Sequence, residues 1–371
     1  MIKVLMFNKL YHPYLGGVER AVYDLCETIK KDVELTVLAS NAKPKTEITY
    51  KDNYRIVRAA SLCRIFSSVY LGISVPLWWC RLKSDIIHFH FPSPIAELYC
   101  LMLCPRGKPL VVTYHADIIG YSKPLFFYRP FLIEFLKRAN RIVVSSPTIV
   151  EQSPFLSKFK NKCITIPYGI ETEKFRLTQE GKNKSEEIRR RFKKPIVLFV
   201  GRLVKYKGLN YLIDAMKKID AVLLIVGNGP EETGLKIIVN ELGVNKEKVF
   251  FLGVVSDKEL PFYYHASDVF VLPSITGQEA FGIVQLEAQA CAKPVVSTAL
   301  PTGVPFANLD GVTGIIVPPR SSEKLAEAIN KLLKDDKLRE QLGLQAKKRV
   351  ESQFTRQVMA QKTLDLYRGL L

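Results

Sequence analysis

The sequence predicts an α/β protein with two doubly wound parallel-sheet domains in tandem. Three observations support this prediction. The 371 residues are enough for two domains, and 47% hydrophobic with 24% charged residues is a globular composition. Short β-branched runs alternate with amphipathic stretches, which is the pattern of βαβ units. A polar segment divides these units into two series.

The first series occupies residues 1–170. It opens on a strand at Val4–Phe7, because the apolar run there is too short for a signal peptide. The other strands predicted in this half are Glu34–Leu38, Ile86–His90, Leu110–Tyr114, Ile142–Ser145 and Ile164–Pro167. Open parallel sheets bind ligands at the carboxyl ends of their strands, so the loops after these strands are candidate sites.

The second series occupies residues 171–353. The charge-dense segment Glu171–Lys194 interrupts the alternation and is interpreted as the linker into this domain. The strands predicted here are Ile196–Val200, Val222–Val226, Val249–Leu252, Val269–Leu272, Val295–Ser297 and Ile315–Val317. Helical spacing marks Leu209–Ile219 and Ile283–Cys291. The final segment, Phe354–Leu371, is predicted to be a helix. Two such domains facing each other would enclose a cleft.

The chain is strongly basic. Its net charge is +18, and residues 1–168 contribute +11 through 23 Lys+Arg against 12 Asp+Glu. Such a surface suits nucleic acid, acidic lipid or a phosphorylated small molecule. Seven cysteines without disulfide or zinc spacing indicate a reduced, cytoplasmic protein. No uncharged stretch is longer than 16 residues, the length of Ile65–Cys80. A membrane span needs about 20, so only a surface contact with a membrane stays open.

Two strand-end loops offer groups for an anion. Gly16 and Gly17 precede a helix, so the backbone can come close to a ligand and the helix amides favour a negative charge. In the second domain, Arg202 offers a planar fork and Lys207 a point charge after the same strand. A plain turn and solvated surface cations are the alternatives for the two loops.

Gly227, Asn228 and Gly229 form another strand-end loop. The sequence GNGPEETG lacks the third glycine of a dinucleotide fingerprint, and the first loop lacks GxGxxG. Nicotinamide and flavin are therefore disfavoured, and no cofactor is expected. The glycines can still bring the backbone close to a nucleotide.

The most informative stretch, residues 273–288, holds two carboxylates eight positions apart. Glu279 lies in a loop, whereas Glu287 lies in a helix predicted to open near Gly282, on the same face as Ile283. A phosphate at that helix start would leave the carboxylates near opposite ends of the ligand, where they accept hydrogen bonds from sugar hydroxyls. Either one alone could instead be a simple helix-dipole partner.

His115 ends the fourth strand of the first domain, where its ring can contact a ligand or shuttle a proton. His88 and His90 share a face of the preceding strand, but no third ligand completes a metal site. The chain contains no Asp-x-Asp clamp for a phosphate-bound divalent ion. No metal site is predicted, and a phosphate must be held by Arg, Lys and amides.

In this order the motifs resemble the retaining nucleotide-sugar glycosyltransferases of family 4, which have two facing Rossmann-like domains with an interdomain cleft, the GT-B type. The matching pieces span the chain: Gly16-Gly17, TYHAD at 113–117, IPYGIE at 166–171, VGRLVKYKG at 200–208, VGNGP at 226–230, EAFGIVQLE at 279–287, PVVST at 294–298 and GVTGIIVPP at 311–319. The segment EAFGIVQLE, with its paired glutamates, is the most specific of these pieces. Tyr168 stands where the family often has Asn, and Ala292 where it often has Gly.

The resemblance implies that the second domain binds the donor. Arg202 and Lys207 would bind the diphosphate. Glu279 would hold the transferred sugar and Glu287 the ribose. The backbone of three further residues would contact the sugar: Phe281, Gly282 and Ile283. The base would lie beside two loops, formed by Gly227, Asn228, Gly229, Val254 and Val255.

For the first domain the resemblance implies contacts to the donor. Gly16 and Gly17 would approach the donor diphosphate, and His115 would contact the sugar near the reacting carbon. The last helix, Phe354–Leu371, would cross back to this domain.

The implied reaction transfers a hexosyl group, with mannosyl favoured, from GDP-mannose or a UDP-hexose to a saccharide or lipid-linked acceptor, in the synthesis of surface polysaccharide, glycolipid or glycan. Arg202, Lys207 and a helix N-terminus would stabilise the leaving diphosphate without a metal. No carboxylate nucleophile is evident. The resemblance therefore favours front-face substitution with retention, in which the leaving phosphate helps to deprotonate the acceptor.

The more basic first domain is expected to bind the acceptor and the cytosolic face of an anionic membrane. Arg64 and Arg81 flank the uncharged segment that bears Trp78 and Trp79. Further along, basic and apolar residues are interspersed: Lys123, Arg129, Lys137, Arg138 and Arg141 with Leu125, Phe126, Phe127, Phe131, Leu132 and Phe135. A core helix with a solvated basic face is the alternative.

Two other functions stay open from the sequence. A nucleic-acid-binding protein on a tandem Rossmann-like platform would account for the charge but not for Glu279 and Glu287. A nucleotide-sugar epimerase of similar fold would form product without an acceptor. We expect the glycosyltransferase, with no nucleic-acid partner.

Overall fold

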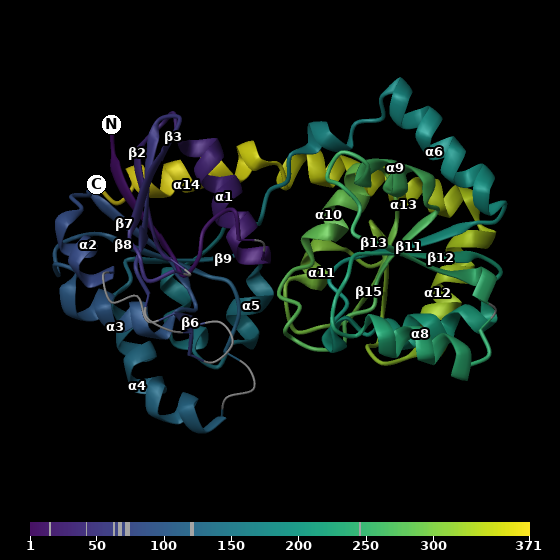
Figure 1. Ribbon diagram of the computed structural model, residues 1–371, viewed down its shortest axis with the longest axis horizontal. Coiled ribbons are helices and arrows are strands. Elements are labelled where there is room, and N and C mark those ends of the chain that lie inside the picture. Colours follow the sequence, from purple (N-terminus) through teal and green to yellow (C-terminus); the bar gives the residue numbers. More distant parts are fainter. Residues whose placement is uncertain are drawn as a thin grey trace. The chain divides into compact units, whose positions relative to one another are not determined.

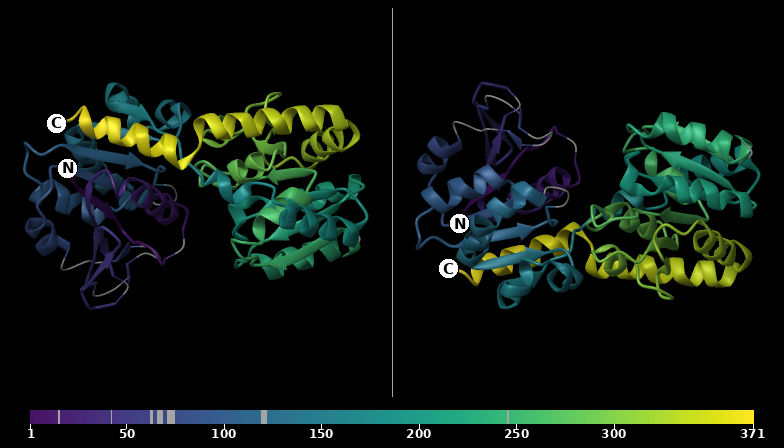
Figure 2. Two further views of the ribbon diagram at one scale, coloured as in Figure 1. Left: turned by 90° about the horizontal axis from the view of Figure 1, so that it is seen from above. Right: turned by 90° about the horizontal axis from the view of Figure 1, so that it is seen from below.

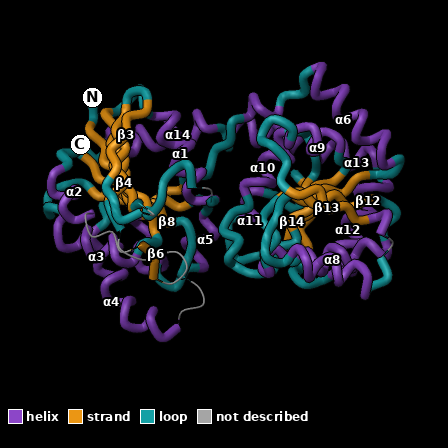
Figure 3. The backbone as a smooth tube through the Cα atoms, in the orientation of Figure 1, coloured by secondary structure: helices purple, strands orange, loops and turns teal. Residues whose placement is uncertain are grey.

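The structure is a computed structural model that describes residues 1–14, 16–41, 43–61, 64–65, 69–70, 75–118, 122–244 and 246–371 (Figure 1). The chain forms two compact units: Met1–Gly169 with Arg356–Leu371, and Ile170–Thr355. In each unit, strands form a central sheet with helices packed around it (Figure 3). The predicted fold class, two α/β units with doubly wound sheets, is confirmed.

The first unit has an eight-stranded sheet. In spatial order the strands are β10 (Cys163–Thr165), β9 (Arg141–Val144), β8 (Leu110–Tyr114), β7 (Ile86–Phe91), β1 (Lys3–Asn8), β2 (Glu34–Ser40), β4 (Tyr54–Ala59) and β3 (Glu47–Lys51). All neighbours pair in parallel except β3, which is antiparallel to β4. The central strands β7 and β8 are buried along their whole length, as expected when helices cover both faces.

The strands β3 and β4 were not predicted. β3 is an edge strand whose residues are exposed or half-buried, so its sequence has no apolar run. In β4, Arg55 and Arg58 interrupt the buried positions. Two short strands, β5 (Arg64–Ile65) and β6 (Val69–Tyr70), form a separate antiparallel pair.

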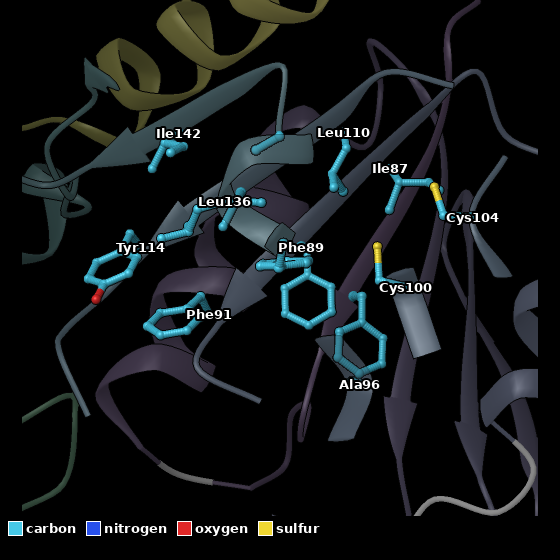
Figure 4. Packing of buried hydrophobic residues seen from close by; sticks show 14 of the residues in the cluster. Ile87, Phe89, Phe91, Ala96, Cys100, Cys104, Leu110, Tyr114, Leu136 and Ile142 are labelled. Carbon is cyan, nitrogen blue, oxygen red and sulfur yellow. The ribbon is translucent and has the colours of Figure 1, made fainter. Parts of the chain in front are cut away.

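Helices cover the two faces of the first sheet. One face packs against α2 (Val75–Arg81), α3 (Pro94–Leu103), α4 (Ser122–Arg138), α5 (Pro147–Gln152) and a 3-10 helix at Leu156–Lys162. The other face packs against α1 (Gly17–Ile29) and α14 (Arg356–Arg368). Figure 4 shows Phe89, Phe91 and Tyr114 on the first of these faces, beside Leu136 of α4. Because side chains alternate along a strand, His88, His90 and Thr113 lie on the α1 and α14 face.

The second unit has a six-stranded, fully parallel sheet. Its strands, in spatial order, are β13 (Val249–Gly253), β12 (Val222–Val226), β11 (Ile196–Val200), β14 (Val269–Leu272), β15 (Val295–Thr298) and β16 (Gly314–Val317). The helices are α6 (Gln179–Phe192), α7 (Leu209–Ala215), α8 (Glu232–Glu241), α9 (Leu260–Ala266), α10 (Ile283–Ala290), α11 (Val304–Ala307), α12 (Ser322–Lys334) and α13 (Asp336–Gln353). Short 3-10 turns lie at Thr172–Phe175, Lys205–Lys207, Met216–Lys218 and Lys246–Lys248.

The interpretation of Glu171–Lys194 as a linker was wrong, because most of this segment is the helix α6. The Thr178 hydroxyl caps its start by accepting from the Gly181 amide at 3.0 Å. Near its end, the Arg189 guanidinium donates to Ala266 O at 2.8 Å and to Asp268 at 2.7 Å. α6 looked like a linker because most of its side chains face solvent and only a narrow stripe is buried.

The last helix, α14, belongs to the first unit although it follows the second in sequence (Figure 2). Met359, Leu364 and Tyr367 enter the apolar cluster that also contains α1. The Arg356 guanidinium forms an ion pair with Asp24 of α1 at 2.6 Å. Apolar burial and one ion pair therefore hold α14 on α1.

None of the helices in the described part of the chain is long and apolar enough to cross a membrane. The uncharged segment Ile65–Cys80 includes residues 66–68 and 71–74, which lie outside the described residues.

We predict that Arg189→Met lowers the free energy of unfolding by about 1–2 kcal/mol, because it removes two charge-assisted hydrogen bonds that fix α6 to α9 and β14. The measurement is urea denaturation followed by circular dichroism. Arg190→Met is the matched control, since among the described residues Arg190 bonds within its own helix, to Glu186 O at 3.4 Å. Equal effects of the two substitutions would contradict this role of Arg189.

Candidate active site

In the second unit, the predicted ligand-binding residues lie at the carboxyl ends of four neighbouring strands. Arg202 and Lys207 follow β11, Gly227–Gly229 follow β12, Val254 and Val255 follow β13, and Glu279 follows β14. The spatial order β13-β12-β11-β14 brings these loops to one edge of the sheet. The structure thus gathers the candidate residues of this unit at one edge.

A buried ion pair joins two of these loops. Lys207 Nζ lies 2.5 Å from Glu279 Oε2, and the two side chains are each only 9% exposed. The Ser274 hydroxyl donates to the same Oε2 at 2.9 Å. Glu279 Oε1 and two of the three ammonium protons have no hydrogen-bond partner among the described residues, and the ammonium lies 5.7 Å from the centre of the Tyr206 ring. The pair therefore presents both an acceptor and donors to a ligand.

Arg202 adds an exposed cation to the same loop as Lys207. Its side chain is exposed and forms no ion pair with a carboxylate of the described residues. A guanidinium in this state can bind phosphate oxygens with two parallel hydrogen bonds. The loop after β11 therefore combines one buried and one exposed cation.

The Gly227 loop is shaped by its neighbours. Gly227 has a φ of 124°, and a Cβ atom there would lie 2.1 Å from Gly201 O. The Gly227 amide donates to Gly253 O at 2.7 Å, and the Leu203 amide donates to Asn228 O at 2.8 Å. Glycine is thus required at 227 by loop packing, independently of a ligand. The contact of this loop with a base stays a prediction.

Next to this loop, Val254 is 71% exposed and Val255 is half-buried. Both follow Gly253, whose carbonyl anchors the Gly227 loop. An exposed apolar side chain at a strand end can pack on the flat face of a base. This contact also stays a prediction.

The helix α10 begins where the sequence predicts. Its N-cap is Gly282, with φ 72°, and a Cβ atom there would lie 2.4 Å from Leu272 of β14. The side chain of Phe281 is buried against Phe306 and Phe354, so only its backbone can face a ligand. The amides of Ile283 and its neighbours start the helix and are suited to an anion.

Glu287 lies one turn further along α10. Its Oε2 accepts a hydrogen bond from the Tyr264 hydroxyl at 2.7 Å. The carboxylate is half-buried and oriented by this bond. Burial and the nearby carboxylate raise the pKa of Tyr264, so its hydroxyl keeps the proton that it donates. An oriented carboxylate of this kind can accept from a pair of hydroxyls.

In the first unit, Gly16 and Gly17 start α1 as predicted, but the carboxylate of Glu19 lies close to Gly16. A Cβ atom at Gly16 would lie 2.1 Å from Glu19 Oε2, so the Glu19 carboxylate folds onto the helix start. Gly17 has open space around it. A diphosphate at Gly16 would compete with Glu19 for the helix amides. The predicted diphosphate contact therefore requires Glu19 to move.

His115 is buried, and both of its ring nitrogens have protein partners. Nε2 lies 2.9 Å from His90 Nδ1, and Nδ1 lies 2.6 Å from the Tyr168 hydroxyl. Burial lowers the pKa of His115 to about 3, so the ring is neutral at neutral pH. Its contact with a sugar stays a prediction, and such a contact would have to displace a protein partner or use the backbone.

His88, considered above as half of a metal pair, is also fully engaged. Its Nδ1 lies 2.5 Å from the Tyr367 hydroxyl and its Nε2 lies 2.6 Å from Thr113 Oγ1. Within the described residues, no group of three or more His, Cys, Asp or Glu side chains is placed to hold a metal ion.

Four residues of these networks were not assigned a role from the sequence: Ser274, Tyr264, His90 and Tyr168. Ser274 directly follows β14, and the alternation His88-x-His90 places two imidazoles on one face. Both of these patterns can be seen in the sequence and could have indicated the two networks. Nothing in the sequence connects Tyr264 with Glu287, which lies 23 positions later.

Comparisons with known proteins agree with this geometry. A model described as Glycosyltransferase Family 4 matches residues 15–174, and one described as Glycosyl transferases group 1 matches residues 181–349. An O-antigen chain mannosyltransferase of Escherichia coli is 30% identical over 100% of this chain and 99% of its own length. A D-rhamnosyltransferase of Pseudomonas aeruginosa is 32% identical over 95% of this chain and 92% of its own length.

Solved structures share the fold. Sucrose-phosphate synthase from Thermosynechococcus elongatus has a TM-score of 0.83 at 23% identity, covering 99% of this chain and 98% of that chain. HepE of Anabaena, solved in complex with UDP, has a TM-score of 0.79 at 19% identity, covering 99% and 100%. These likenesses show the GT-B fold, and together with the matches over both halves they establish that the chain belongs to the glycosyltransferases, with a family 4 first half and a group 1 second half.

Proposed function

We propose that this glycosyltransferase moves a mannosyl group from GDP-mannose to a saccharide or lipid-linked acceptor, with retention and without a metal ion. The observation that carries the proposal is the buried pair of Lys207 and Glu279, fixed by Ser274 beside the exposed Arg202. Cations and a carboxylate at one sheet edge match a ligand that has a diphosphate at one end and sugar hydroxyls at the other.

Charge development explains the arrangement. When the bond between the sugar C1 and the phosphate oxygen breaks, negative charge grows on the leaving diphosphate. Arg202, Lys207 and the start of α10 supply fixed positive charge there, which is worth most where water is excluded. This supports transfer without a metal.

The state of Glu279 favours front-face substitution over double displacement as the route to retention. Its Oε2 is already bound by Lys207 and Ser274, so this carboxylate is a hydrogen-bond acceptor rather than a ready nucleophile. In the proposed step the acceptor oxygen bonds to C1 on the face that the phosphate leaves. The acceptor proton passes to the departing phosphate oxygen, so no protein base is needed.

The choice of GDP-mannose draws on the relatives. An Escherichia coli relative is named a mannosyltransferase, and a Mycolicibacterium smegmatis relative, 27% identical, is named a GDP-mannose-dependent mannosyltransferase acting on a phosphatidylinositol mannoside. UDP-hexoses are the alternative donors, as HepE was solved with UDP.

The proposed membrane contact is narrower than the sequence suggested. Trp79, Leu132 and Phe135 are buried in the core, so they were wrongly assigned to a membrane-facing surface. Trp78 packs against that core, and Arg138 caps α3 by donating to Cys104 O at 2.5 Å. The side chains of Arg64, Arg81, Lys123, Leu125 and Phe126 lie outside the described residues.

What remains exposed on α4 is a mixed apolar and basic face. Phe127 is 75% and Phe131 49% exposed, four positions apart on the same side of the helix. Arg129 and Lys137 are exposed on the same helix. We propose that this face rests on an anionic membrane and brings the enzyme to a lipid-linked acceptor.

We predict that Lys207→Ala and Glu279→Ala each lower kcat by about 100-fold or more, because each removes a charge that stabilises the reacting ends of the donor. Each single change also leaves a buried charge unpaired, at about 3–5 kcal/mol. The double variant Lys207→Met/Glu279→Gln removes this penalty, and we expect it to be folded and inactive. Lys205→Ala, an exposed lysine of the same loop, is the control. Full activity in either single variant would refute the assignment.

A second prediction concerns the product. With GDP-mannose and a lipid-linked saccharide primer, the linkage should keep the donor's anomeric configuration, as read by NMR, and a chelator should leave the rate unchanged. An inverted linkage would refute retention, and loss of activity that Mg²⁺ restores would refute metal independence. A UDP-hexose used in preference to GDP-mannose would identify the alternative donor. Product formed without any acceptor would favour the epimerase.

A third prediction concerns the membrane. Phe127→Ser/Phe131→Ser should weaken binding to phosphatidylglycerol vesicles by about tenfold or more, since it removes apolar area that the lipid would bury. Co-sedimentation measures this binding, and transfer to a soluble acceptor should be unchanged. Ile237→Ser, at a 51% exposed position in α8 of the second unit, is the matched control. Wild-type protein that does not bind these vesicles would disprove the contact.

A further inference from the structure

A line of side chains in the first unit, buried except for the half-buried Tyr168, is not used by the proposed reaction step. It runs through Met6, His90, His115 and Tyr168. His90 Nε2 lies 2.9 Å from Met6 Sδ, and His90 Nδ1 lies 2.9 Å from His115 Nε2. His115 Nδ1 lies 2.6 Å from the Tyr168 hydroxyl. Each contact is a hydrogen bond, so the line is continuous from β1 to the loop after β10.

The sheet brings these residues together. β1, β7 and β8 are neighbours, and alternation places Met6 and His90 on the face that α1 and α14 cover. His115 directly follows β8. Its ring stacks on that of His90 with centroids 5.2 Å apart and planes 20° apart. His90 is 3% and His115 2% exposed, so no water replaces the contacts between them.

The chemistry of Met6 sets the direction of every hydrogen bond in the line. A thioether sulfur can accept a hydrogen bond but cannot donate one. His90 must therefore carry its proton on Nε2, since a bare nitrogen there would face sulfur lone pairs with no donor between them. Burial lowers the pKa of both imidazoles, so each ring is neutral and has a single proton.

The protonated nitrogen of His90 determines where the protons of His115 and Tyr168 lie. With Nε2 of His90 protonated, its Nδ1 is bare and accepts from Nε2–H of His115. Nδ1 of His115 is then bare as well, and it accepts from the Tyr168 hydroxyl. The opposite order would leave a buried acceptor of His90 unsatisfied.

We propose that His90, oriented by Met6, is a positioning residue that holds His115 in its Nε2–H tautomer and in one ring orientation at the carboxyl edge of the first sheet. His90 itself touches no substrate. Its effect on the rate rests on the proposed glycosyl transfer and on the predicted contact of His115 with the sugar, whereas the tautomer does not.

His88 is a matched comparison for His90. It lies on the same strand and the same face, is 1% exposed, and stacks on His90 with centroids 4.6 Å apart. Its ring nitrogens bond to Tyr367 and Thr113, and neither bonds to His115. Removing His88 should therefore perturb the packing about as much as removing His90 does, without changing the tautomer of His115.

The direct test is long-range ¹H–¹⁵N correlation NMR of the full-length protein labelled at histidine. The chain has five histidines, which single His→Gln variants assign. We expect the neutral Nε2–H pattern for both His90 and His115. The Nδ1–H pattern at His115 would overturn the proposal whatever the kinetics show.

Variants then connect the tautomer to the rate. His90→Leu should lower kcat by about 10- to 100-fold, the range for groups that orient metal-bound histidines, with little change in KM for the donor. His90→Asn keeps an oxygen acceptor near the position of Nδ1 and should restore most of kcat and the Nε2–H pattern. Met6→Leu conserves volume, so it should remain folded, but it should mix the tautomers of His90 and His115.

The control variants distinguish a packing role of His90 from a positioning role, and they test the assignment of His115 separately. His88→Leu should keep both the tautomer and kcat, and an equal loss of kcat there would reduce the role of His90 to packing. Unchanged tautomers in Met6→Leu would also overturn the proposal. If His115→Ala keeps full transfer while the wild-type tautomers are as expected, the assignment of His115 fails and the positioning by His90 stands.

Discussion

Parallel pairing of the strands is the constraint on which the candidate site depends. Because β13, β12, β11 and β14 all run in the same direction, four loops from distant parts of the sequence emerge at one edge. These loops contact one another: the backbone of Gly227 packs closely against Gly201, and Lys207 forms an ion pair with Glu279. Lys207 and Glu279 thus hold each other across two loops, and the backbone of the Gly227 loop is fixed by Gly201 and Gly253.

The fold was largely predictable because its strands are buried on both faces. An uninterrupted apolar run such as Ile196–Val200 has few other interpretations, and the run was found as β11. The failures are elements that bury little. The edge strand β3 has no apolar run, and α6 buries only a narrow stripe of a highly charged sequence. In such elements, hydrogen bonds to neighbours decide the structure, and composition does not report those bonds.

The candidate site was predictable in its charges but not in its pairings. Lys207 and Glu279 could be singled out because cations and carboxylates after strands are chemically conspicuous. That they bond to each other, and that Ser274 shares the carboxylate, depends on the order of strands in space. For the same reason His88 and His90 resembled a metal pair, although their partners are hydroxyls, a thioether and a third imidazole.

The return of α14 to the first unit has a consequence for synthesis on the ribosome. Ile170–Thr355 is one continuous stretch, so it can finish folding as soon as it emerges. The first unit must wait for residues 356–371, whose Met359, Leu364 and Tyr367 cover one face of its sheet. Until then an apolar surface and the unpaired Nδ1 of His88 stay open to water. Residues 170–355 are therefore complete before the unit that precedes them in sequence.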